Sequence, residues 1–209
     1  MACILVHGSG HKATSWNEAI SYMKSDKEIL CPNLYTILNG QEANYVDLYT
    51  SFARYCNDVI GQIDLCGLSL GGMLALNYTL DFPEKVKTLV IIGTPHKIPK
   101  ILFSIQNIIF KFLPKSIFKN MEFSKKDTLI LVDSMKEWDL SSKVQNIKCP
   151  TLVICGKKDR ENIKSAYFLA KNIKNAKLKI IENTGHIVNE ENPKSLAKEL
   201  DDYYLLNTI

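Results

Sequence analysis

The sequence has little arginine, a small net charge and no long apolar run. Arginine occurs only at Arg54 and Arg160, so nearly all of the 26 basic residues are lysines, and the formal net charge is +4. Lysines spread along a chain are typical of a solvated surface, whereas a nucleic-acid interface needs clustered basic residues and base-stacking aromatics. No apolar run reaches the about 18 residues that cross a bilayer. We therefore expect no nucleic-acid partner and no stable membrane insertion.

The N-terminus and the cysteines argue against a secreted, disulfide-linked or metal-binding protein. No charged lead with a long apolar core and a cleavage site precedes the first strand-like run, so we expect no signal peptide. The six cysteines contain no C-x-x-C pair and no metal-ligand spacing. Cys3, Cys66 and Cys155 lie in or beside apolar runs that predict buried strands, and Cys56 lies in a predicted helix. These features predict free, mostly buried thiols, no metal site and a cytoplasmic location.

Repeats, low-complexity tracts and flexible linkers are also missing, which indicates one domain. With 209 residues, 46% of them hydrophobic and 23% charged, the chain can bury a sizeable core. Alternating strands and helices predict a three-layer α/β/α sandwich with a mostly parallel open sheet. The expected strands are 3–6, 28–32, 63–67, 86–92, 151–155 and 177–181, and the expected helices are 15–25, 45–61, 70–82, 163–173 and 193–204.

The most informative motif is Gly67-Leu68-Ser69-Leu70-Gly71, between a predicted strand and a predicted helix. Glycines on both sides let the backbone make a sharp turn there. Such a turn exposes the Ser69 hydroxyl and places the Leu70 N–H at the start of a helix, where backbone donors are unpaired. The motif therefore predicts Ser69 as a nucleophile.

A serine hydroxyl needs a base and an acid that orients the base. His186 and Asp159 each follow a predicted strand, in the chain order serine, aspartate, histidine. Loops at the carboxyl ends of parallel strands converge on one edge of a sheet, so the three residues can meet. Asp133 and Asp139 compete with Asp159 for the acid's role, but only Asp159 directly follows a strand. Asp64 begins its strand and should lie at the opposite edge.

An oxyanion hole is predicted near the N-terminus. The glycine-rich loop 7–10, His-Gly-Ser-Gly, follows the first strand and can fold close to the nucleophile. The backbone N–H groups of Ser9 and Leu70 are the candidate oxyanion donors. We expect His7 to fix this loop through hydrogen bonds rather than to titrate in catalysis.

Together these motifs resemble the α/β-hydrolase superfamily, and its serine esterases and lipases in particular, over residues 3–200 except for 96–147. The matching pieces are His7-Gly8-Ser9-Gly10, Gly67-Leu68-Ser69-Leu70-Gly71-Gly72, Gly156-x-x-Asp159, Gly185-His186 and Glu191-Asn192-Pro193. The resemblance implies the α/β-hydrolase fold and the roles already given to Ser69, Asp159 and His186. Family members usually have two more strands before the histidine–glycine loop, so we expect a sheet shortened at that edge.

Residues 96–146 interrupt the alternation and are expected to form a helical cap insertion. Apolar residues fall at helical spacing over 98–112. An amphipathic helix there would place its apolar face over the pocket, and Ile105, Ile109 and Phe112 are the candidate substrate-binding residues. Two other interpretations stay open: ordinary core packing, and a helix that rests on a membrane or lipid surface. The apolar cap predicts a partly apolar substrate.

These observations predict a serine hydrolase that cleaves a carboxylic ester or similar acyl bond of a small molecule without a cofactor. Carbon–carbon bond hydrolases, enol-lactone hydrolases and cofactor-free lyases keep the same serine and remain alternatives. A ligand-sensing protein with slow turnover is a further alternative.

Overall fold

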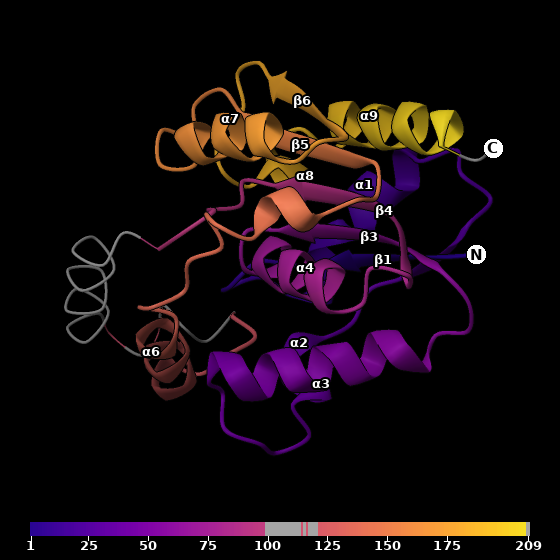
Figure 1. The fold of residues 1–209 in the computed structure, drawn as a ribbon. Helices are drawn as coiled ribbons and strands as arrows, with labels where there is room; N and C mark the ends of the chain where they lie inside the picture. Colours follow the sequence, from indigo (N-terminus) through magenta and orange to yellow (C-terminus); the bar gives the residue numbers. More distant parts are fainter. Residues whose placement is uncertain (99–113, 115, 117–120, 208–209) are drawn as a thin grey trace.

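The computed structural model describes residues 1–98, 114, 116 and 121–207 (Figure 1). Six strands form one open sheet in the order β2-β1-β3-β4-β5-β6, and every neighbouring pair is parallel. The strands are β1 (Ala2–Val6), β2 (Glu28–Leu30), β3 (Ile63–Leu68), β4 (Val86–Ile92), β5 (Thr151–Gly156) and β6 (Ala176–Ile181). The predicted parallel sheet is thus confirmed, and β4 has the bounds predicted from the sequence.

Helices cover both faces of the sheet, as a parallel sheet requires. One side carries α3 (Tyr45–Asp58), α4 (Leu70–Asp81) and α7 (Ile163–Asn172), and the other carries α1 (Asn17–Tyr22), α8 (Val188–Glu191) and α9 (Pro193–Leu206). Short helices α2 (Leu34–Ile37) and α6 (Lys125–Ser134) pack near α3. Two 3-10 turns, Ala13–Trp16 and Val144–Asn146, complete the described elements. The expected three-layer architecture is confirmed.

Each strand contributes to two separate cores because successive side chains point to opposite faces. In β1, Ile4 and Val6 belong to the core under α3, α4 and α7, whereas Cys3 and Leu5 belong to the core under α1 and α9. All four side chains are fully buried. Burial on both faces explains why inner strands such as β1 are continuous apolar runs in the sequence, whereas the edge strand β6 carries the exposed Lys177 and Lys179.

The predicted cap lies largely outside the described residues. Of the expected helix 98–112 only Ile98 is described, and it is buried. The candidate substrate-binding residues Ile105, Ile109 and Phe112 therefore lie outside the described part, and the cap remains a prediction. Helix α6 lies in the same insertion and was not predicted separately.

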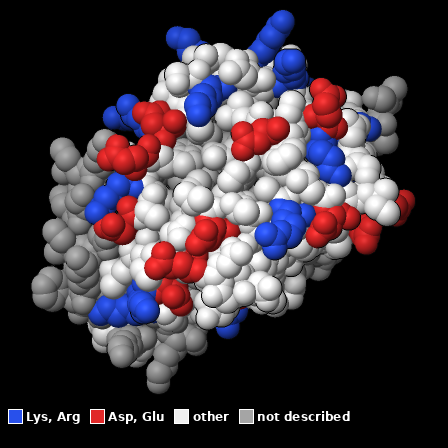
Figure 2. Space-filling view, turned by 60° about the horizontal axis from the view of Figure 1, so that its bottom comes forward, with Lys and Arg blue, Asp and Glu red and all other residues white. Residues whose placement is uncertain are grey.

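The cysteines, the helix lengths and the surface charges relate to three further sequence predictions. All six cysteines are free, and Cys3, Cys56, Cys66 and Cys155 are buried as predicted. No helix among the described residues is long and apolar enough to cross a membrane. On the face of the molecule in Figure 2, basic and acidic side chains are interspersed rather than gathered by sign.

Candidate active site

Ser69 stands between β3 and α4 in a strained backbone conformation, with φ +53° and ψ −112°. A serine in this left-handed region costs conformational energy, and such strain is concentrated at functional sites. Its N–H donates to the Ile92 carbonyl at 2.9 Å, which ties the turn to β4. A Cβ at Gly67 would lie 2.2 Å from the Gly71 carbonyl oxygen, and one at Gly71 would lie 2.3 Å from the Val6 carbonyl oxygen. The turn therefore requires glycine on both sides of Ser69.

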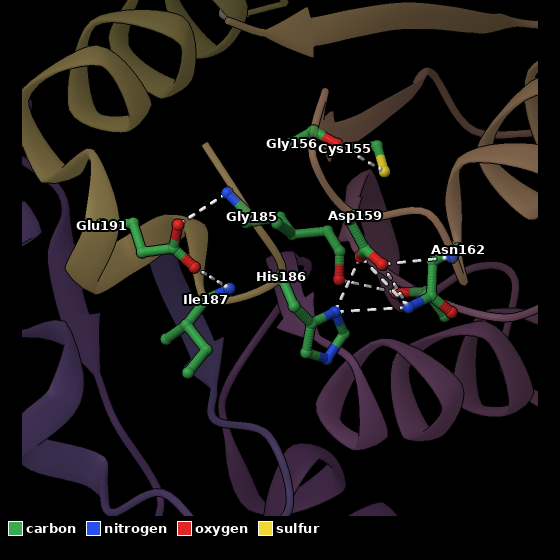
Figure 3. A network of polar contacts seen from close by, with 10 residues as sticks. Cys155, Gly156, Asp159, Asn162, Gly185, His186, Ile187 and Glu191 are labelled. Atoms are coloured by element: carbon green, nitrogen blue, oxygen red, sulfur yellow. Dashed lines mark hydrogen bonds and ion pairs between the residues drawn. The ribbon is translucent and has the colours of Figure 1, made fainter. Parts of the chain in front are cut away.

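Asp159 and His186 come together from the loops after β5 and β6 (Figure 3). The Nδ1 atom of His186 lies 2.7 Å from Oδ2 of Asp159. The two loops are joined by a backbone hydrogen bond from the Lys158 N–H to the Thr184 carbonyl at 2.8 Å. The Asp159 side chain is 3% exposed and that of His186 is 39% exposed. A buried acid next to an accessible imidazole is the arrangement in which the acid orients a base.

Asn162 completes the surroundings of the Asp159 carboxylate. Its Nδ2 atom donates to both carboxylate oxygens at 3.1 Å, and its backbone N–H donates to Oδ1 at 3.1 Å. Burial raises the pKa of Asp159, but the hydrogen bond and charge of His186 together with the Asn162 hydrogen bonds leave that pKa below its ordinary value. The carboxylate therefore stays ionised at neutral pH. Asn162 was not predicted from the sequence, where its position three residues after Asp159 was the only signal.

Gly93 links the serine turn to the aspartate–histidine pair. It directly follows Ile92, the residue that accepts the Ser69 N–H. It has φ +52°, and a Cβ there would lie 3.0 Å from Nδ1 of His186 and 3.2 Å from Oδ2 of Asp159. Ser69 and the Asp159–His186 pair thus both lie at the same end of β4. The carboxyl ends of β3, β4, β5 and β6 place them at one edge of the sheet.

The predicted oxyanion loop lies against the nucleophile. A Cβ at Gly8 would lie 3.4 Å from Cβ of Ser69. Ser9 lies within a turn closed by the hydrogen bond from the His11 N–H to the Gly8 carbonyl at 3.3 Å. Leu70 begins α4, so its N–H has no acceptor within the helix. The roles of Ser9 and Leu70 as oxyanion donors remain predictions.

His7 is a fully buried neutral ring that supports this loop. Its Nδ1 bonds the Gly8 carbonyl at 2.9 Å, and its Nε2 accepts the Leu34 N–H at 3.3 Å, so one nitrogen donates and the other accepts. Burial lowers the pKa of His7 to about 4. A ring engaged at both nitrogens fixes the loop through hydrogen bonds, as the sequence predicted.

The competing carboxylates lie elsewhere. Asp133 is in α6 and pairs with Lys136, while Asp139 accepts the Ser141 N–H at 2.8 Å. Asp64 is fully buried at the start of β3, where it accepts from Lys27 at 2.5 Å. None of these three contacts involves His186, so the geometry favours Asp159 as the acid. Among the described residues no group of three or more histidine, cysteine or carboxylate side chains is placed to hold a metal ion.

Residues 3–199 match the model of the alpha/beta hydrolase family. The chain belongs to this family. It is 30% identical over 161 residues to the monoacylglycerol lipase ABHD6 of Mus musculus, covering 67% of this chain and 48% of that protein. The chain thus spans about half the length of this relative.

Solved structures of low sequence identity share the fold of this hydrolase. A thermophilic esterase from Thermogutta terrifontis superposes with a TM-score of 0.80 at 18% identity, over 99% of this chain and 90% of that one. An enol-lactonase from Burkholderia xenovorans LB400 gives 0.81 at 16% identity, over 98% and 91%. These proteins have different activities, so the likeness supports the fold alone.

Proposed function

We propose that this hydrolase cleaves a carboxylic ester, or a similar acyl bond, of a small and partly apolar molecule through an acyl-enzyme. The observation that carries the proposal is the contact between His186 and the buried Asp159 at the sheet edge where Ser69 stands in its strained turn. A nucleophile, a base and an orienting acid are the minimum set for covalent acyl transfer.

In the proposed reaction, the Ser69 hydroxyl oxygen attacks the ester carbonyl while His186 takes the serine proton. The resulting oxyanion accepts hydrogen bonds from the N–H groups of Ser9 and Leu70, each worth about 3–4 kcal/mol of transition-state stabilisation. His186 then returns the proton to the departing alcohol, and the acyl group stays on Ser69. A water molecule, deprotonated by His186, attacks the acyl-enzyme and releases the acid. Asp159 stabilises the imidazolium in both halves of the reaction.

The alternatives use the same residues with different substrates. A lactone or carbon–carbon bond substrate stays open, because the same nucleophile, base and acid can act on either. A ligand sensor would keep the triad but would turn over slowly. The relatives named as monoacylglycerol lipases make monoacylglycerols the first natural esters to test.

The test is a panel of p-nitrophenyl esters of increasing acyl length, measured beside monoacylglycerols and an enol-lactone. We expect multiple turnovers on the esters, with kcat/KM depending on acyl length. Preferential turnover of the lactone would support the alternative. A single stoichiometric burst on every substrate would support the sensor.

A further inference from the structure

Glu191, the last residue of α8, holds the backbone on both sides of His186 (Figure 3). Its carboxylate accepts the Gly185 N–H at 2.6 Å and the Ile187 N–H at 3.1 Å. One oxygen accepts each N–H, so a single side chain holds the backbone on both sides of the candidate base. We call these two hydrogen bonds the Glu191 bracket. Hydrogen bonds from an N–H to a carboxylate are stronger than those to a neutral acceptor.

Gly185 is shaped to this carboxylate. A Cβ at position 185 would lie 2.8 Å from Oε1 and 2.9 Å from Oε2 of Glu191, and the third nearest atom is Cδ of the same side chain. Real Cβ atoms do not approach other heavy atoms so closely. The Glu191 carboxylate would therefore have to shift from this position to make room for a side chain at 185.

Besides the two hydrogen bonds of the Glu191 bracket, the segment around the base is held at Thr184, whose carbonyl accepts the Lys158 N–H, and at Ile187, whose carbonyl accepts the Glu190 and Glu191 N–H groups. His186 lies in the irregular segment between β6 and α8, and its side chain is 39% exposed. Asp159 and Asn162 contact the ring only at Nδ1. A displacement of about 1 Å in a catalytic group can lower a rate about 10²-fold. The backbone from which the ring projects must therefore be fixed by its own hydrogen bonds.

We propose that Glu191 is a positioning residue for the base: its carboxylate fixes the 185–187 backbone so that the His186 ring faces both Asp159 and Ser69. This inference rests on the proposed function, because it needs His186 to act as the base. Glu191 itself touches neither the nucleophile nor a substrate in this scheme.

The test compares Glu191→Ala and Glu191→Gln with Glu182→Ala as the matched control. Glu182 lies just after β6 and forms an exposed ion pair with Lys157, so its loss removes the same charge without affecting the bracket. For Glu191→Ala we expect a kcat about 10²-fold lower, a KM within about two-fold of wild type, and slower labelling of Ser69 by a fluorophosphonate. Glu191→Gln retains one acceptor oxygen and should give an intermediate kcat. Glu182→Ala should match wild type.

A second variant makes the inference independent of one substitution. Gly185→Ala should displace the carboxylate and lower kcat, by no more than Glu191→Ala does. The double variant should be little worse than Glu191→Ala alone, because both substitutions act on the same two hydrogen bonds.

Unchanged kcat in folded Glu191→Ala would overturn the inference, as would additive losses in the double variant. If Glu191→Ala does not fold, Glu191→Gln decides: a kcat equal to wild type overturns the inference. Wild-type protein that neither hydrolyses esters nor labels with the fluorophosphonate would instead refute the proposed function.

Discussion

Asn162→Ala should lower the stability of the protein, because the charged Asp159 carboxylate loses hydrogen bonds. The variant loses the side-chain donor to both carboxylate oxygens and keeps the backbone N–H and the His186 contact. A hydrogen bond to a charged group contributes about 1.5–3 kcal/mol. We expect the free energy of unfolding at pH 7 to fall by about that amount, as measured by urea denaturation.

Asn172→Ala is the matched control in the same helix. Asn172 ends α7 and donates from Nδ2 to the neutral Phe168 carbonyl at 2.8 Å. A neutral hydrogen bond contributes about 0.5–1.5 kcal/mol. Asn172→Ala should therefore lower the free energy of unfolding by less than Asn162→Ala does, and by the same amount at all pH values.

The effect of Asn162→Ala should depend on pH with a defined sign. The folded-state pKa of Asp159 lies below its ordinary value, so its stabilisation is present above the unfolded pKa and is lost as pH falls through the folded pKa. Removing Asn162 raises that folded pKa. The difference in unfolding free energy between wild type and variant should therefore be largest at pH 7 and should shrink only below the ordinary aspartate pKa, so that it is smaller at about pH 2.5 than at pH 7. An equal difference at both pH values would refute the reasoning, because it would mean that Asn162 does not act on the carboxylate.

Three further predictions concern the candidate acid, a buried ion pair and the predicted cap. Asp159→Asn should lower kcat for ester hydrolysis about 10⁴-fold, because the amide favours the wrong imidazole tautomer. Asp133→Asn should leave kcat within a few-fold of wild type. The opposite result would assign the role of the acid to Asp133. Lys27→Met should cost about 3–5 kcal/mol in urea denaturation because it leaves the buried Asp64 charge without its cation, and a loss below about 1 kcal/mol would contradict this pairing. Phe112→Ala should change the ratio of kcat/KM for long and short acyl esters about ten-fold, and an equal loss on both would indicate core packing rather than a cap.

The sequence predicted the sheet because its signals are local. Continuous apolar runs mark strands buried on both faces, and Pro83 follows the end of α4 closely. The place of the candidate acid beside His186 could also be predicted, because Asp159 comes three residues after the strand that ends at Gly156. The short helix α8 was missed because four residues carry too little periodicity to be distinguished from a loop.

The supporting residues could not be predicted from spacing alone. Asn162 and Glu191 act through hydrogen bonds whose partners depend on the paths of two loops from neighbouring strands. An asparagine at the start of a helix predicts a capping role, yet the Asn162 side chain bonds the Asp159 carboxylate instead. Glu191 was recognised only as part of a motif, and its contacts on either side of His186 required the structure.

The most direct measurement is covalent labelling of the protein with a fluorophosphonate, followed by mass spectrometry of its peptides and ester turnover assays of wild type and Ser69→Ala. The account predicts one adduct on Ser69 in the wild type, no adduct in Ser69→Ala, and a kcat lower by about 10⁴–10⁶ in a variant that melts at the same temperature. An adduct retained by Ser69→Ala, or ester hydrolysis that survives the substitution, would contradict the central claim that Ser69 is the nucleophile.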